Sequence, residues 1–198
     1  MKKTFLLILT SLVFLAGCSK NEENLVPDDE TPEVLKFITR DSPIGTIGML
    51  DGVEGIVVEL PAVKEGDGDS GWKADQDYPA KKVVIAINNI GGGWPLYEMY
   101  AAYQEKTVWR IPHIEELCGL YNMKDVTWTE NGCRWAIGNS SLFLCGGQYI
   151  SDKYDYDFAM ASEFLYGLGF NTNIKRAYFG RYLFSYFPYL RLFHDMPQ

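Results

Sequence analysis

An alternation of apolar and polar residues in the second half of the chain is the feature that most restricts its fold. Over residues 153–166 (KYDYDFAMASEFLY) the apolar side chains fall in phase at alternate positions, namely Tyr154, Tyr156, Phe158, Met160, Phe164 and Tyr166. A period of two is that of a β-strand with one buried face and one polar face. Residues 181–193 repeat the pattern, but Pro188 interrupts it, which predicts an edge strand or a strand broken into two pieces.

Two strands and two helices are predicted in the first half of the chain. Residues 55–60 (GIVVEL) and 82–88 (KVVIAIN) are short, β-branched and bounded by Gly, Pro or Asn, which is typical of strands. Residues 95–105 and 112–121 each begin with a proline and place apolar side chains three and four positions apart, the pattern of short amphipathic helices. Helices followed by strands predict an α+β domain, with the two helices packed on a twisted antiparallel sheet.

The first 17 residues carry the pattern of a secretory signal. Lys2 and Lys3 precede an apolar run at 5–16, which is shorter than the roughly 20 residues that a transmembrane helix needs. The run ends in LAGC (15–18), which resembles the lipobox of bacterial lipoproteins. The resemblance implies that residues 1–17 are a lipoprotein signal peptide and that Cys18 is lipidated, which would anchor the chain to a membrane.

An acidic tether is predicted between the lipidated cysteine and the folded part. Residues 19–33 contain six acids, one lysine and two prolines, so they cannot bury enough apolar surface to fold. Residues 18–33 are therefore assigned to a tether, and residues 34–198 to one folded domain. KNEE (20–23) resembles the acidic export signal of some Bacteroidota lipoproteins, which implies an outer-membrane location facing the cell exterior; a solvated linker is the alternative.

The charge of the chain argues against nucleic acid as a partner. The formal net charge is −8, whereas binding to a polyanion depends on Lys and Arg side chains that neutralise phosphates. The glycine run at 91–93 is not followed by the lysine and hydroxyl residue that a phosphate-binding loop needs. No cofactor is therefore predicted.

The cysteines of the folded part do not form a metal-binding pattern. Cys133 and Cys145 lie twelve positions apart on either side of a predicted turn, so a disulfide between them is compatible with the oxidising bacterial envelope, although spacing cannot decide it. Cys118 lies on the apolar side of the second helix and is predicted to be a buried thiol. Because no Cys or His cluster has ligand spacing, no metal site is predicted.

Catalysis is not expected from the sequence. The two histidines, His113 and His194, lie in the first turn of a helix and next to the C-terminus, where neither is placed beside a nucleophile. The acidic segment 65–79 offers oxygen ligands for calcium, but it lacks the ligand positions of an EF-hand loop. A solvated acidic loop is therefore the preferred interpretation.

Several short motifs resemble one family. WRIP (109–112), followed by acidic residues and leucine, resembles the W-R-L-P-T-x-x-E-L element of the Lcl C-terminal and Fibrobacter-type major paralogous domains, and YLRL (189–192) resembles their closing strand. The resemblance implies a C-type lectin-like or formylglycine-generating-enzyme-like fold. It gives structural roles to Trp109, Arg110, Pro112 and Arg191, with Trp109 in the core and Arg110 paired near the last strand. His113 departs from the family's Thr or Ser, and Arg191 lacks the neighbouring arginine.

Ligand binding through exposed tryptophans is the functional hypothesis that the sequence supports. Trp72, Trp128 and Trp135 have polar surroundings and could stack on a sugar ring, while core packing is the alternative for each. The chain is therefore predicted to be a non-catalytic, lipid-anchored binding module for glycan or protein ligands. The alternative is a structural or accessory subunit of a surface or fimbria-like assembly, which an open sheet edge or an apolar patch would favour.

Overall fold

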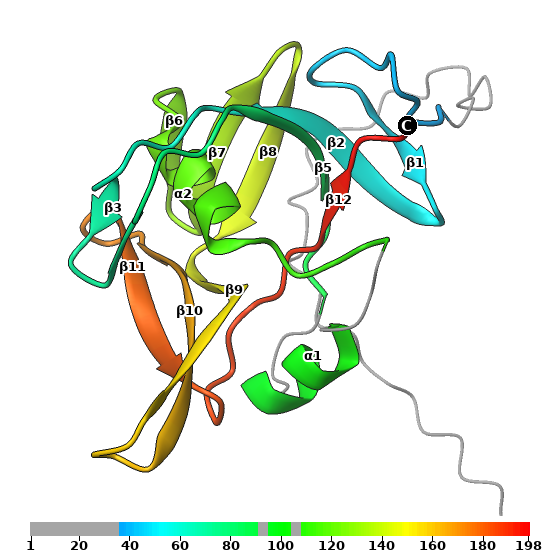
Figure 1. The fold of residues 1–198 in the computed structure, drawn as a ribbon. Helices are drawn as coiled ribbons and strands as arrows, with labels where there is room; N and C mark the ends of the chain where they lie inside the picture. Colours follow the sequence, from blue (N-terminus) through cyan, green and yellow to red (C-terminus); the bar gives the residue numbers. More distant parts are fainter. Residues whose placement is uncertain (1–35, 91–94, 104–107) are drawn as a thin grey trace, which may run out of the picture. The chain divides into compact units, whose positions relative to one another are not determined.

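The computed structural model describes residues 36–90, 95–103 and 108–198 (Figure 1). The predicted signal peptide at 1–17, the lipidated Cys18 and the tether at 18–33 lie outside the described residues. The helices are α1 (Leu96–Tyr103) and α2 (Ile114–Asn122). The strands are β1 (Ile47–Leu50), β2 (Val53–Leu60), β3 (Gly68–Asp69), β4 (Trp72–Lys73), β5 (Lys81–Ala86), β6 (Val126–Thr129), β7 (Gly132–Ile137), β8 (Ser140–Cys145), β9 (Gly147–Asp157), β10 (Ser162–Asn171), β11 (Arg176–Leu183) and β12 (Phe193–Asp195).

The described strands form four small antiparallel sheets. Their orders are β1-β2-β5-β12, β11-β10-β9, β6-β7-β8 and β3-β4. The prediction of an α+β fold built on antiparallel strands with two short helices is confirmed. The prediction of one sheet is wrong, because the strands of the second half separate into two three-stranded sheets, and only β12 returns to pair with β5.

Strands β2 and β5 lie between two hydrophobic clusters and are buried on both faces. Alternate residues point to opposite sides, so Ile56 and Val58 enter one cluster while Val57 enters the other. This explains why the segments predicted as strands read as uninterrupted β-branched runs. The first cluster packs against α2, β6 to β8 and the inner halves of β9 to β11, and the second packs against α1 and the segment that carries Trp109.

Both predicted helices are present, with the expected apolar faces buried. In α1, Leu96 and Met99 are buried, and Pro95 precedes the first turn. Helix α2 begins two positions after Pro112, because the backbone of His113 is still extended. The backbone N–H of His113 donates to the Glu116 carboxylate at 2.9 Å. Within the described ranges, no helix is long and apolar enough to cross a membrane.

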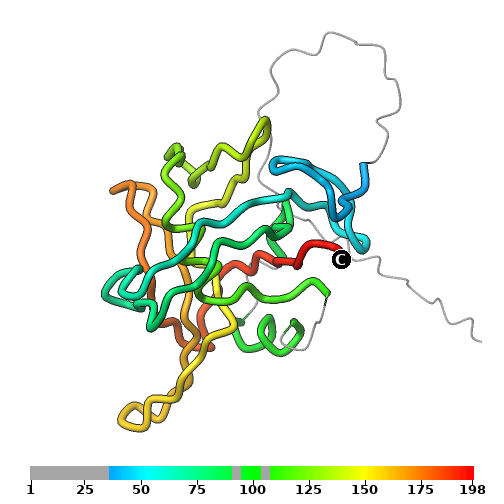
Figure 2. Tube along the Cα trace, turned by 45° about the horizontal axis from the view of Figure 1, so that its top comes forward, coloured from blue at the N-terminus to red at the C-terminus, as the bar shows by residue number. Residues whose placement is uncertain are grey.

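The alternating segment 153–166 is a hairpin and not one strand. Its residues belong to β9 and β10, which pair antiparallel around a turn at 158–161. Phe164 is buried as predicted, but Tyr154, Tyr156, Phe158 and Met160 are exposed, so the prediction of one buried face fails for them. The reason is that the far end of the hairpin projects past the body of the sheet in both views (Figures 1 and 2).

The segment 181–193 is broken into two strands with Pro188 between them, which was one of the two predicted alternatives. Strand β11 ends at Leu183 and β12 begins at Phe193. Between them Tyr189 forms a bridge with Tyr149, and Leu190 forms a bridge with Ile90. The chain thus crosses from the β9–β11 sheet to the β1–β12 sheet in this stretch.

Candidate functional site

The three tryptophans proposed for ligand binding differ in exposure. Trp72 and Trp135 are buried, with 8% and 2% of their surface exposed, while Trp128 is half-buried. Trp72 packs on Phe179 with ring centroids 5.5 Å apart and lines none of the surface pockets described below. Its surroundings are those of a core residue, and the other two tryptophans lie together elsewhere.

Trp128 and Trp135 line an open pocket of about 390 Å³, which we call the aromatic pocket. This volume lies in the range typical of small-ligand sites, roughly 300–1,000 Å³. The aromatic pocket is lined by Tyr121, Val126, Trp128, Trp135, Phe170, Lys175, Arg176 and Ala177.

Strand register explains why the two tryptophans meet. In the β6–β7 hairpin Val126 pairs with Trp135, and Trp128 pairs with Cys133. Directly paired residues, and residues two apart on one strand, share a face of a sheet, so both indoles lie on the same side. Phe170, at the end of β10, contacts both of them, with ring centroids 6.2 Å from Trp128 and 5.7 Å from Trp135.

One polar group of the aromatic pocket is without a partner. The indole Nε1 of Trp135 is buried, and no acceptor for its hydrogen exists among the described residues. A buried indole N–H normally donates to an acceptor, because leaving a buried donor unpaired costs about 1–3 kcal/mol. The atom has no exposed surface, like the unpaired polar atoms of Asn89, Tyr182 and Arg191, so it is not open to a ligand in the aromatic pocket.

A second, polar pocket of about 460 Å³ meets the aromatic pocket at Phe170. Its side chains come from the β6–β7 turn, the β8–β9 junction and the β10–β11 turn, and they include Glu130, Asn131, Thr172 and Asn173. The amide and hydroxyl groups donate and accept hydrogen bonds, and the carboxylate of Glu130 accepts them. An extended ligand could therefore contact rings on one side of Phe170 and polar groups on the other.

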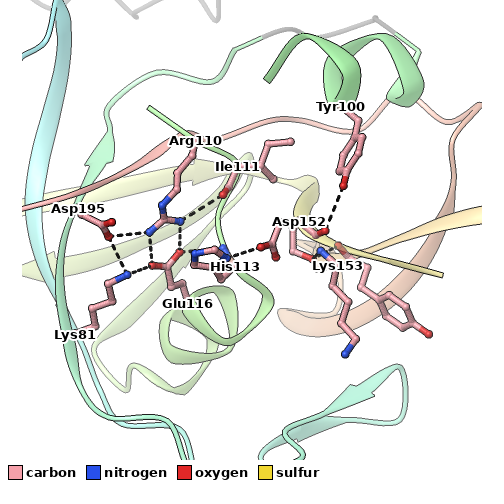
Figure 3. A network of polar contacts seen from close by, with 11 residues as sticks. Lys81, Tyr100, Arg110, Ile111, His113, Glu116, Asp152, Lys153 and Asp195 are labelled. Carbon is pink, nitrogen blue, oxygen red and sulfur yellow. Dashed lines mark hydrogen bonds and ion pairs between the residues drawn. The ribbon is translucent and has the colours of Figure 1, made fainter. Parts of the chain in front are cut away.

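A network of ion pairs around the buried Glu116 holds the start of α2 against the last strand (Figure 3). Arg110 donates two hydrogen bonds to the carboxylate of Glu116, at 2.8 and 2.7 Å, and one to Asp195 in β12 at 2.9 Å. Lys81 of β5 reaches both carboxylates, at 2.9 and 2.8 Å. Three segments that are distant in sequence are thereby joined.

The charges of this network shift the pKa values of its members. Burial would raise the pKa of Glu116, but the hydrogen bonds and charge of Arg110, assisted by Lys81, outweigh it and hold the pKa below its ordinary value. Burial also opposes the charge on Asp195, yet Lys81 and Arg110 lower its pKa to about 2. All four groups are therefore charged at neutral pH, which is the behaviour of a structural ion network.

His113 pairs with Asp152 at the start of α2, as Figure 3 shows. The hydrogen bond to Asp152 raises the pKa of His113. In the described part of the chain, no hydroxyl or thiol hydrogen-bonds to the His113 ring, which a His-activated nucleophile would do. His194 instead contacts Asp51 through Nε2 at 3.1 Å and packs edge-on against Trp109.

The residues of the WRIP segment lie inside the fold. Trp109 is 7% exposed, and its Nε1 donates to the Leu50 carbonyl at 2.9 Å. Gly55 lies beneath the indole, where a Cβ would come within 3.0 Å of the ring. Pro112 is buried, and its carbonyl accepts a hydrogen bond from the N–H of Asp152. These contacts link β1, β2 and β9 to the segment before α2.

Arg191 is buried and binds backbone carbonyls. Its Nη1 donates to the Ala86 and Ile87 carbonyls, and its Nη2 donates to Phe143 at 3.0 Å. Burial lowers the pKa of Arg191. The side chain connects the end of β5 with β8, so it has no exposed surface to offer a ligand.

Strand register opposes the disulfide that spacing allowed between Cys133 and Cys145. Cys133 pairs with Leu144, whereas Cys145 pairs with Gly132. Neighbouring pairs of an antiparallel ladder point to opposite faces, so a bridge would require one strand to turn over. Cys133 is a free thiol with no exposed surface, and burial raises its pKa to about 12.

The acidic segment 65–79 forms the small β3–β4 hairpin, and its carboxylates bind neighbouring protein groups. Asp69 accepts hydrogen bonds from the Gly71 N–H at 2.8 Å and the Phe179 N–H at 2.7 Å, which ties the hairpin to β11. Asp77 pairs with Lys64 at 2.8 Å. Among the residues that the structure describes, no group of three or more His, Cys, Asp or Glu side chains is arranged to hold a metal ion.

Sequence patterns pointed to only part of the aromatic pocket. Tyr121 ends the segment 112–121 that is predicted as an amphipathic helix, but nothing local relates it to Phe170 or to Lys175 and Arg176 at the start of β11. The alternation in VTWT (126–129) was the available signal for a strand that carries Trp128 on the face of Val126.

Comparison of the chain with protein-family models, curated proteins and solved structures finds no match in any of the three. The function is therefore inferred from the chain's own residues.

Proposed function

We propose that this chain is a lipid-anchored surface protein that binds glycans in its aromatic pocket and has no catalytic activity. The observation that carries the proposal is the wall of the aromatic pocket, where Trp128, Trp135 and Phe170 line one open hollow. Sugar rings present apolar C–H faces that stack on aromatic rings, and their hydroxyl oxygens accept hydrogen bonds. Trp128, which is half-buried, offers a ring face for stacking, and the polar pocket that shares Phe170 offers hydrogen bonds.

The N-terminal sequence supports the anchored location. The lipobox-like LAGC at 15–18 would place a lipid on Cys18, and a tether of 16 residues from 18 to 33 would hold the domain near an outer-membrane surface. A fully extended residue spans about 3.3–3.6 Å, so the tether reaches at most roughly 55 Å. That reach suits the capture of polymers outside the cell.

We further propose that the domain belongs to the C-type lectin-like class suggested by its WRIP motif. Two features support this proposal. Arg110 pairs with Asp195 in the last strand, and the buried Trp109 joins the segment before α2 to the first hairpin. Glycan binding would be consistent with such a class, although folds of one class serve many functions.

A glycan array probed with the full chain, solubilised in mild detergent, tests the proposal. Specific binding is expected for the unchanged chain and should be lost in Trp128→Ala. Trp72→Phe is the matched control, because it alters a tryptophan outside the aromatic pocket while keeping an aromatic core residue. Circular dichroism checks that each variant is folded. A blank array, or equal binding by Trp128→Ala, would contradict the proposal.

An assembly subunit is the second candidate, and the exposed end of the β9–β10 hairpin favours it. We call residues 153–162 the hairpin arm; Phe158 is 88% exposed at its tip, and Tyr156 packs edge-on against it at 4.8 Å. Asp157 accepts hydrogen bonds from the Ala159 and Met160 N–H groups, which fixes the tip. An ordered apolar tip of this kind is typical of a contact surface.

The partner that fits the hairpin arm is a second copy of the chain. Strand β9 is at the edge of its sheet, and its outer residues 153–157 lie beyond the contacts with Tyr189 and Pro112, where an exposed edge can pair with another edge through backbone hydrogen bonds. Sedimentation of the full chain in detergent should then show a dimer that Phe158→Ser weakens. Phe187→Ser, which alters another exposed phenylalanine, should leave the dimer unchanged. A monomer at all concentrations would contradict this candidate.

A further inference from the structure

We infer that the aromatic pocket selects acidic sugars, with Lys175 and Arg176 binding the carboxylate or sulfate of the ligand. The inference rests on the proposed glycan-binding function and specifies its ligand class. It predicts which sugars the pocket takes and which it does not.

The charge of the aromatic pocket is opposite to that of the chain. The formal net charge is −8, but the charged residues that line this pocket are Lys175 and Arg176, both cations. Both side chains are exposed, and neither is paired with a carboxylate in the described residues. Arg110 and Arg181 are held by acids, whereas other exposed cations of the described residues, such as Arg134, lack an ion pair as Lys175 and Arg176 do. The two pocket cations are therefore available to an anion.

The backbone holds the two cations at the rim. Lys175 ends the β10–β11 turn in the left-handed region at φ 51°, a conformation that is uncommon for residues other than Gly, Asn and Asp. The turn is closed by Asn171, whose side chain accepts the N–H of Ile174 at 3.3 Å. Arg176 then pairs with Asn171 as the first residue of β11. The turn thus places both residues beside the aromatic wall.

The chemistry of the lining groups suits a ring that carries a negative charge. An arginine binds a carboxylate or sulfate through two parallel hydrogen bonds, and a lysine adds a point charge. Trp128, which is half-buried, can stack on the ring face. Two cations are too few for a nucleic-acid polymer, whose affinity depends on neutralising many phosphates. A uronic acid or a sulfated sugar in an oligosaccharide meets all of these conditions.

Binding of three matched probes to the full chain, solubilised in mild detergent, tests the inference by calorimetry. The probes are a galacturonate tetramer, the same tetramer with its carboxyl groups methyl-esterified, and a 6-sulfated galactose tetramer. The methyl ester keeps the rings and removes the charge. The acidic tetramer should bind about tenfold or more tightly than its ester, and rising salt should reduce that difference. The sulfated probe tells whether the cations accept sulfate as well as carboxylate.

Variants then assign the preference to the two cations. The double variant Lys175→Gln, Arg176→Gln should lose the roughly tenfold advantage of the acid and bind acid and ester alike. Arg134→Gln is the control, because Arg134 is exposed on the opposite face of β7. Equal binding of acid and ester by the unchanged chain, or a preference that survives in the double variant, overturns the acidic-sugar inference while glycan binding stands. Binding of no probe, together with a blank array, overturns both.

Discussion

Removal of the Glu116 carboxylate should strongly destabilise the fold, because it takes away the acid at the centre of the ion network. Glu116 is 3% exposed and accepts hydrogen bonds from Arg110, from Lys81 and from the His113 N–H. In Glu116→Ala, Lys81 can turn to solvent because its side chain is 41% exposed. Arg110 cannot, because its side chain is only 14% exposed, and it retains Asp195 alone as a carboxylate partner.

The cost follows from the buried charge that is left behind. Breaking a buried ion pair by removing one partner typically costs about 3–5 kcal/mol, mostly from the uncompensated charge. We therefore expect Glu116→Ala to lower the free energy of unfolding by about 3–5 kcal/mol. Urea unfolding followed by circular dichroism measures this loss, and with a slope of roughly 1–3 kcal/mol/M the midpoint should fall by at least about 1 M.

Two further variants make the Glu116 prediction refutable. Glu115→Ala alters the neighbouring acid in the same helical turn and should change stability by less than about 0.5 kcal/mol. Arg110→Met combined with Glu116→Leu removes both charges and should be more stable than Glu116→Ala. If Glu116→Ala lowers the free energy of unfolding no more than Glu115→Ala does, the ion network does not stabilise the fold and the prediction is refuted.

Further predictions concern acid stability and backbone packing. The pKa of Asp195 is lowered from its ordinary value of 3.8 to about 2 in the fold, so the ionised carboxylate stabilises the folded chain above pH 3.8. That contribution is lost as the pH falls from 3.8 to about 2. Asp195→Asn should therefore show a shallower loss of unfolding free energy over this pH range than the unchanged chain, measured by urea titration at each pH; equal slopes would contradict the assignment. In Gly71→Ala the added Cβ would lie 1.9 Å from the Phe179 carbonyl oxygen, so one of the two hairpins has to shift. Gly71→Ala is expected to destabilise the fold by about 1–3 kcal/mol, measured by thermal unfolding. Ser70→Ala, which alters the exposed neighbour, should cause little change. A Gly71→Ala chain as stable as the unchanged chain would mean that the β3–β4 hairpin is not held against β11.

Local elements were predictable where side-chain spacing alone decides them. The β-branched runs became β2 and β5, and the apolar spacing after Pro95 and Pro112 became α1 and α2. The alternating segment 153–166 was predictable as β structure but not as a hairpin, because its turn residues 158–161 (FAMA) lack the Gly, Asn and Pro that usually indicate a turn. Asp157 supplies the turn instead, by accepting two backbone N–H groups from the loop.

The sequence by itself determined the two helices, strands β2 and β5, the β structure of 153–166 and the expectation of a lipid-anchored N-terminus. Each of these depends on residues that are neighbours along the chain. Only the tertiary structure decided which tryptophans are buried and which line the aromatic pocket. Tyr121, Trp128, Phe170 and Arg176 come from α2, β6, β10 and β11, and no local pattern relates them. Strand register and sheet packing bring them together, and these are set by burial of the whole core and not by any one segment.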